Sequence, residues 1–221
     1  MPTALITGAG GGIGSAIATA LAPTHRLLLA GRPSPRLDAV AQRLRAETVS
    51  LDLTDADAIR DVAHAVDALD VLVHNAGVSI PSHVGDSQIE DWRTTFDVNV
   101  IGPVALTLAL LPVLRRSQGH VVFINSGSGR RVSPGMASYS ASKFALRSFA
   151  DSLLQDEPAL RVTSVFPGRT DTGMQHELVA FEGGEYDAAN FLRPETVAQV
   201  VAAAVATPAD GDVQEVVLRP R

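Results

Sequence analysis

The stretch TALITGAGGGIGSAIATALA, residues 3–22, decides the fold. It opens with a short apolar run that predicts a β-strand ending at glycines. It closes with GIGSAIATALA, residues 12–22, whose apolar residues have helical spacing and are followed by Pro23. The sequence therefore begins with a strand, a glycine-rich turn and a helix.

The turn itself reads TGAGGGIG, with glycines at positions 8, 12 and 14. Glycine lets the backbone turn tightly and approach a pyrophosphate, which then rests on the helix N-terminus. A glycine-rich string alone is weak evidence and could be a flexible connection. In this strand–turn–helix context it predicts dinucleotide binding. The expected contacts are Gly8, Gly12, Ile13 and Gly14.

Strands alternate with helices along the rest of the chain. Further strands are expected at residues 25–32, 48–53, 70–77, 119–126, 161–168 and 214–220. Further helices are expected at residues 34–46, 54–69, 89–117, 140–155 and 193–206. Parallel strands need crossover helices, so the pattern predicts a doubly wound parallel sheet in three α/β/α layers, a Rossmann fold. We expect one domain, residues 1–221, with an irregular substrate-loop segment at 173–193.

Composition excludes several classes of protein. A chain of 221 residues with 46% hydrophobic and 19% charged residues is typical of a globular domain. The net charge is −6, and no run of lysine and arginine exceeds two neighbours, so we expect no nucleic-acid partner. The chain has no cysteine, which rules out disulfides and thiol chemistry, and we predict no metal site.

The N-terminus enters an apolar strand at once, so we predict no signal peptide. The most apolar stretch, VALTLALLPVL at residues 104–114, is too short to span a bilayer and contains a proline. We therefore expect a cytoplasmic protein without a membrane partner.

The segment MASYSASKFAL, residues 136–146, holds the only lysine of the chain, Lys143, four positions after Tyr139. Residues four apart share a helix face, so the two side chains project together. A free phenol has a pKa of about 10, and a neighbouring ammonium lowers that pKa toward the range of acid–base catalysis. Lysine also donates hydrogen bonds in several directions, whereas the planar fork of arginine is fixed. The alternative is a solvated lysine with no role.

These residues occur together with HNAG at 74–77, Asn99, Ser126 and YSASK at 139–143. In this order, over nearly the whole chain, they resemble the single-domain short-chain dehydrogenase/reductase family. The resemblance implies an oxidoreductase that transfers a hydride between a nicotinamide cofactor and a carbonyl or alcohol substrate.

The resemblance also implies the catalytic roles. Tyr139 would be the general acid/base at the substrate oxygen, and Ser126 would hydrogen-bond the same oxygen. Lys143 would hold the nicotinamide ribose and lower the pKa of Tyr139. Asn99 would hold a water that relays protons to Lys143. Ser126 lies thirteen residues before Tyr139, the usual spacing of the family, and Ser128 is the alternative.

Asn99 has a further argument from the sequence. Pro103 lies four residues later in the expected helix, and proline has no N–H to bond the carbonyl of residue 99. That carbonyl is therefore free to bind a water. A simple helix kink beside Gly102 is a compatible interpretation.

The second strand ends LAGRP, residues 29–33, without an acidic residue but with Arg32. Arginine at this point favours NADP(H) through the 2′-phosphate. Many NADP-dependent relatives carry a basic residue where this chain has Gly11, so NAD(H) stays an alternative. The family resemblance implies further cofactor contacts at Asp52, Leu53, Asn75, Ala76, Gly77, Tyr139, Lys143, Pro167, Thr170 and Thr172.

Asp52 and the neighbouring motif residue His74 carry further interpretations. Asp52 could instead cap the helix that follows it. The family more often has asparagine where His74 stands, and we interpret His74 as structural.

We expect a small or medium carbonyl compound, or its alcohol, between residues 78–84, 130–136 and 173–193. A homodimer is expected through helices at about 91–116 and 138–156, with a homotetramer as the alternative. Two other functions remain possible readings of the chain. One is a nucleotide-binding redox sensor or scaffold without turnover, and the other is a sugar-nucleotide epimerase or dehydratase. The complete tyrosine–lysine–serine–asparagine set and the short C-terminal region argue against them.

Overall fold

The computed structural model describes residues 1–208 and 210–221. Its strands are β1 (Thr3–Thr7), β2 (Arg26–Gly31), β3 (Glu47–Ser50), β4 (Val71–His74), β5 (His120–Ile124), β6 (Arg161–Pro167) and β7 (Glu215–Leu218). They form a seven-stranded parallel sheet in the order β3-β2-β1-β4-β5-β6-β7. The sequence order reverses where β1 lies between β2 and β4, which in such sheets is the place where a ligand binds.

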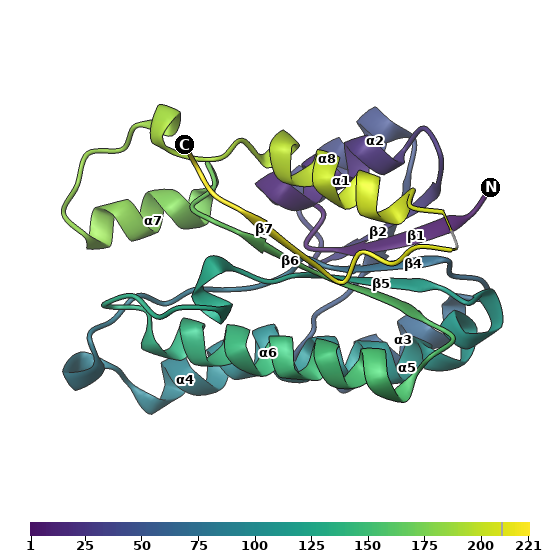
Figure 1. Cartoon of the computed structure of the whole chain (residues 1–221), viewed down its shortest axis with the longest axis horizontal. Helices are drawn as coiled ribbons and strands as arrows, with labels where there is room; N and C mark the ends of the chain where they lie inside the picture. Colours follow the sequence, from purple (N-terminus) through teal and green to yellow (C-terminus); the bar gives the residue numbers. More distant parts are fainter. Residues whose placement is uncertain (209) are drawn as a thin grey trace.

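Helices cover both faces of the sheet. The α-helices are α1 (Gly12–Leu21), α2 (Pro35–Leu44), α3 (Ala56–Ala65), α4 (Ile89–Phe96), α5 (Gly102–Ser117), α6 (Ala137–Asp156), α7 (Gly173–Phe181) and α8 (Pro194–Val205). Short helical turns are η1 (Val84–Asp86), η2 (Asp97–Ile101), η3 (Gly127–Gly129) and η4 (Ala188–Asn190). Figure 1 shows α1, α2 and α8 on one face and α3 to α6 on the other. The predicted doubly wound α/β/α fold is confirmed.

The sheet is buried from both sides. Every residue of β1, β4 and β5 is buried, as expected for parallel strands that helices cover on two faces. One core cluster includes Leu72, Leu106 and Phe123 on the side of α3, α5 and α6. The other includes Ile6 and Val201 on the side of α1, α2 and α8. These two cores hold the strands between the helices, so the loops that follow the strands meet at one edge of the sheet.

Two expected elements differ from the structure. The helix expected at 89–117 is interrupted by the π-helical segment η2, where the Gly102 N–H bonds the Asp97 carbonyl. Pro103 has no N–H for the ordinary pattern, so the helix widens there. The segment 173–193 is not an irregular loop, because it contains α7 and η4. The signal for α7 is Thr172, whose hydroxyl caps the helix by accepting from the Gln175 N–H at 3.3 Å.

The helical run Ile89–Ser117 is long and apolar enough to cross a membrane by length and composition, and its most apolar window has a mean hydropathy of 1.8. It is longer than the apolar stretch recognised in the sequence. In this fold 44% of its most apolar window is buried, and α5 contributes Leu106, Leu110 and Leu114 to the core. Core helices of soluble proteins pass the same test, so the run carries little weight as a membrane span.

Candidate active site

The glycine turn after β1 is shaped by close backbone contacts. Gly8 has φ of 65°, and a Cβ there would lie 2.9 Å from the Ala76 Cα. A Cβ on Gly14 would lie 2.6 Å from Asn75 Nδ2. That amide donates to the carbonyls of Thr7 at 3.0 Å and Gly8 at 3.1 Å. Side chains at these two glycines would push the turn away from the loop that follows β4.

The N-terminus of α1 is open to a ligand. Gly11 caps it without a side-chain hydrogen bond, and its first turn carries no acidic residue. The first amides of a helix have no partner within the helix and attract anions, so this end fits a phosphate group. Gly12 leaves room beside Thr172, since a Cβ there would lie 3.2 Å from the threonine methyl group. Ile13 is half-buried and packs on the core below the turn.

The loop after β4 is held against the turn. Thr7 Oγ1 accepts from the N–H of Asn75 at 3.0 Å and of Ala76 at 3.1 Å. Gly77 comes next, and a Cβ there would lie 3.1 Å from Asn99 Oδ1 and 3.7 Å from Lys143 Nζ. The expected segment 75–77 therefore lies between the glycine turn and the polar residues described next.

Tyr139 and Lys143 project from the first turns of α6, and both are buried. Lys143 Nζ donates to the Ile124 carbonyl at 3.0 Å and lies 5.7 Å from the centre of the Tyr139 ring. Ser126, two residues after the end of β5, lies close enough to Tyr139 to lower the pKa of its phenol. The structure therefore brings together three of the four residues expected to be catalytic.

The pKa of Tyr139 differs from the sequence-based expectation. Burial raises it above the ordinary value, and the neighbouring Ser126 hydroxyl offsets only part of that increase. Desolvation disfavours the phenolate more strongly than its neighbours stabilise it. Burial also lowers the pKa of Lys143 to about 8, so its ammonium is a weaker source of positive charge above that pH. The expected net lowering of the Tyr139 pKa by Lys143 is wrong for this structure.

Asn99, the fourth expected residue, is fully buried in η2. Its Oδ1 accepts from the Val78 N–H at 2.8 Å, and its Nδ2 donates to the Val78 carbonyl at 2.9 Å. Nδ2 also donates to Ser142 Oγ at 3.0 Å. The side chain thus joins the loop after β4 to α6, while the widened helix and Pro103 leave the backbone geometry around residue 99 irregular.

Asn125 was missed by sequence reasoning. Its Oδ1 accepts from the Ser126 N–H at 2.9 Å, and its Nδ2 donates to the Lys143 carbonyl at 3.1 Å. It therefore couples the position of Ser126 to that of α6. A polar residue at the end of an otherwise apolar strand was the available signal. Ser128 donates its N–H to Ser126 Oγ at 3.1 Å and lies in the turn η3.

Arg32, the residue expected to bind the 2′-phosphate of NADP(H), directly follows β2. Arg32 is exposed and near enough to Asp52 to contribute to a lowered carboxyl pKa there. The larger cause of that lowering is Thr54, whose N–H and hydroxyl donate to Asp52 Oδ1 at 2.9 Å and 2.7 Å. The residue that caps α3 is Asp55, so the capping interpretation of Asp52 is wrong. Leu53 is buried beside it.

The segment after β6 lies beside the glycine turn. Pro167 ends β6 and is buried. Thr170 Oγ1 donates to the Gly168 carbonyl at 3.0 Å, and Thr172 caps α7. Because Thr172 also lies against Gly12, this segment borders the N-terminus of α1.

The three segments expected around the substrate meet beside the site. The Ser82 N–H donates to the Gly135 carbonyl at 2.9 Å. Phe181, at the end of α7, lies 5.3 Å from the His83 ring. Gly135 has φ of 72°, and a Cβ there would lie 2.5 Å from Phe181 Cε1. α7 therefore contacts the loops after β4 and β5.

The contacts of His74 are those of a packed core residue, as expected from the sequence. It stacks on Phe123 with ring centres 5.0 Å apart, and its Nε2 is 2.8 Å from Thr107 Oγ1. Burial lowers its pKa to about 3, so the ring is neutral at ordinary pH.

The fold and this arrangement define a dinucleotide-binding α/β protein, and comparison with known proteins is consistent with that class. The family model described as short chain dehydrogenase matches residues 2–183. An uncharacterized oxidoreductase of Staphylococcus epidermidis is 35% identical over 227 residues, covering 98% of this chain and 96% of that protein. The chain belongs to the short-chain dehydrogenase/reductase family.

Two solved structures are similar over almost their whole length. An alcohol dehydrogenase from Thermococcus sibiricus, complexed with 5-hydroxy-NADP, has a TM-score of 0.90 and 28% identity, covering 100% of this chain and 97% of that one. A 3-oxoacyl (acyl-carrier-protein) reductase from Agrobacterium tumefaciens, with NADP bound, has a TM-score of 0.87 and 26% identity, covering 99% and 93%. The chain is a hydride-transfer oxidoreductase that uses a nicotinamide cofactor and acts on small molecules.

Proposed function

We propose that this protein is an NADP(H)-dependent reductase of small or medium carbonyl compounds, or a dehydrogenase of the corresponding alcohols. The observation that supports this most directly is the grouping of Ser126, Tyr139 and Lys143 beside the glycine turn. A protein that only bound the nucleotide, as a sensor or scaffold, would have no use for a buried proton-transfer pair.

The cofactor supplies or accepts the hydride at the substrate carbon. Tyr139 donates its phenolic proton to the carbonyl oxygen as negative charge develops there, and accepts a proton in the reverse direction. Its raised pKa keeps the phenol protonated at neutral pH, which is the form that proton donation requires. Ser126 donates a hydrogen bond to the same oxygen, and its distance from Tyr139 is fixed through Asn125.

Lys143 holds the ribose hydroxyls next to the nicotinamide. Its ammonium has three donors, and within the described residues one hydrogen bond is found, to Ile124. Asn99 positions the loop containing Val78 and would hold the water of a proton relay at its backbone carbonyl. The remaining cofactor contacts are those expected from the sequence, at the glycine turn, Asp52, Leu53, residues 75–77 and the segment from Pro167 to Thr172.

The preference for NADP(H) rests on Arg32. It is exposed at the end of β2, where a guanidinium can bind the 2′-phosphate in a bidentate manner. Two structurally similar proteins carry NADP or its derivative, which supports the same choice. Use of NAD(H) is the alternative.

We also propose a homodimer through α5 and α6. The apolar side chains of Ile101, Leu108 and Phe144 are 56%, 58% and 43% exposed on or beside these helices, and burial by a second copy would remove them from water. Light scattering should give twice the mass of the chain, and Leu108→Glu should give a monomer. A fourfold mass would instead establish the tetramer, and a monomeric wild type would contradict the proposal.

The function is tested by binding and turnover together. Thermal unfolding is measured with NADPH and with NADH at equal concentrations, since a ligand at a hundred times its Kd adds about 2.7 kcal/mol of stability. Loss of NADPH absorbance is then followed with a panel of aldehydes and ketones. A larger shift with NADPH and turnover of at least one carbonyl are expected. Binding without any turnover would favour the sensor or scaffold.

A further inference from the structure

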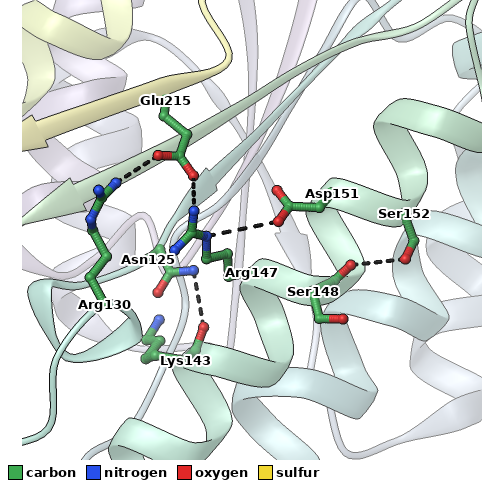
Figure 2. A network of polar contacts seen from close by, with 8 residues as sticks. All are labelled: Asn125, Arg130, Lys143, Arg147, Ser148, Asp151, Ser152 and Glu215. Carbon is green, nitrogen blue, oxygen red and sulfur yellow. Dashed lines mark hydrogen bonds and ion pairs between the residues drawn. The ribbon is translucent and has the colours of Figure 1, made fainter.

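A shared carboxylate joins two arginines beside the candidate active site (Figure 2). Glu215 Oε2 accepts from Arg130 Nη1 at 2.6 Å, and Glu215 Oε1 accepts from Arg147 Nη2 at 2.6 Å. Both guanidinium groups lie over the ring of Phe166 on β6, with their carbon atoms 5.2 Å and 5.5 Å from its centre. Asp151, one turn further along α6, lies 3.8 Å from Arg147 Nε. One residue of β7 therefore contacts side chains from two other elements.

Each arginine closely follows a residue of the candidate site. Arg130 ends the turn η3, four residues after Ser126. Arg147 is four residues after Lys143 on α6, and so on the same side of that helix. Figure 2 shows both arginines converging on Glu215. The two elements whose relative position sets the distance from Ser126 to Tyr139 are thus bound to the same strand.

The turn that carries Ser126 has a second attachment at its far end. Residues 126–129 read SGSG and offer no large side chain for packing. Asn125 holds the start of the turn to the Lys143 carbonyl, and Arg130 holds its end to β7. Glycines and serines leave the backbone between these points many conformations unless both ends are fixed.

We propose that Glu215 is a positioning residue: through Arg130 and Arg147 it fixes Ser126 relative to Tyr139. This inference rests on the proposed roles of those two residues. The side chains of Arg130, Arg147 and Glu215 are 36%, 33% and 33% exposed. Ion pairs this exposed add little to the stability of the fold, so their effect should be found in the geometry of the site.

The chain offers a matched control at the opposite edge of the sheet. Glu47 is the first residue of β3, as Glu215 is of β7, and it also binds an arginine. Arg26 donates to both oxygens of Glu47, at distances of 2.7 Å and 2.9 Å through Nη2. No residue of the candidate site lies in this pair. Glu215→Gln and Glu47→Gln therefore remove the same charge, one from a carboxylate that binds two arginines and one from a carboxylate that binds one.

The experiment compares these two variants with the wild type. For Glu215→Gln we expect kcat to fall about tenfold, as a misplaced catalytic group would cause. Nucleotide Kd and thermal midpoint should change no more than in Glu47→Gln. The pH dependence of kcat should move toward higher pH, because a displaced Ser126 no longer lowers the pKa of Tyr139. Equal kcat in the two variants would overturn the proposal.

A second readout is independent of turnover. Lys143 is the only lysine, so protein with isotope-labelled lysine gives one side-chain NMR signal in the presence of NADPH. This signal should move in Glu215→Gln and stay in place in Glu47→Gln. If no carbonyl is turned over by the wild type, the proposed function fails, and this comparison still decides the positioning role. An unmoved signal in both variants would overturn it.

Discussion

Asn99 and Ser142 are joined by a buried hydrogen bond of 3.0 Å from Nδ2 to Oγ. Ser142 Oγ donates in turn to the backbone carbonyl of Tyr139 at 2.7 Å. The π-helical segment η2 is thereby connected to the first turn of α6. In the proposed mechanism, this connection keeps Asn99 and Tyr139 at a fixed separation.

Ser142→Ala should test this connection. The change removes two buried hydrogen bonds while Asn99 Nδ2 keeps its bond to Val78, so we expect a loss of about 1 kcal/mol in the free energy of unfolding. Urea unfolding measures it. Ser152→Ala is the control on the same helix, since Ser152 is exposed and bonds only the Ser148 carbonyl. Equal stabilities for the two variants would contradict the structural role of Ser142.

Ser126→Ala should lower kcat by about 10²–10³-fold, the usual effect of removing one donor from a developing oxyanion. Ser128→Ala should change kcat far less, because Ser128 binds Ser126 through its backbone N–H. Steady-state kinetics with one carbonyl substrate compare the two. A larger loss in Ser128→Ala would exchange their assigned roles.

Arg32→Ala should weaken NADPH binding about tenfold to a hundredfold, the range for one lost hydrogen bond to a charged group. NADH affinity should barely change. Titration calorimetry with both nucleotides measures the difference, and Arg43→Ala, an exposed arginine in the last turn of α2, serves as control. Equal losses of affinity for both nucleotides would contradict the assignment of Arg32 to the 2′-phosphate.

Two buried histidines should make the fold sensitive to acid. Burial lowers the pKa of His74 and of His120 to about 3, while unfolding returns both to about 6.5. The unfolded state therefore binds more protons below pH 6.5, and stability present above that pH is lost as pH falls toward 3. Each histidine should contribute a slope of up to about 1.4 kcal/mol per pH unit.

Unfolding free energies between pH 7 and pH 4.5 measure this slope. His74→Asn should reduce it, whatever its effect on absolute stability. The same slope in His74→Asn and wild type would show that His74 is not buried as a neutral ring.

Lys143 should titrate near pH 8. Burial lowers its pKa to about 8, so its ammonium loses its proton as pH rises through that value. In the proposed mechanism nucleotide affinity should weaken over the same range, because the donor to the ribose loses its charge. The NMR signal of the single lysine gives the pKa directly. A midpoint near the ordinary lysine value of 10.5 would contradict the burial of Lys143.

The sequence predicted the sheet and helices well because its signals are local. The apolar strands and the glycine turn each depend on residues that lie close together in the chain. The helix α7 was missed, since Gly173 opens it and two glycines follow it. The π-helical segment was not predicted: the sequence indicated only a free Asn99 carbonyl or a kink before Pro103, because the register of the helix depends on packing.

The site was predicted less completely. The tyrosine–lysine spacing indicated that the two side chains share a helix face, and the structure places them so. Their pKa values could not be read from spacing, because desolvation depends on burial within the whole fold. Asn125 and Glu215 were missed for a related reason. Their partners are 18, 68 and 85 residues away in the chain.

The most direct test of the account is the turnover of Tyr139→Phe, measured with NADPH and a carbonyl substrate of the wild type. Loss of the hydroxyl removes the proton donor and leaves the ring in place. We expect kcat to fall by at least about 10²-fold. Nucleotide binding should persist, as thermal unfolding with NADPH would show. Turnover close to that of the wild type would contradict the assignment of Tyr139 as the general acid/base.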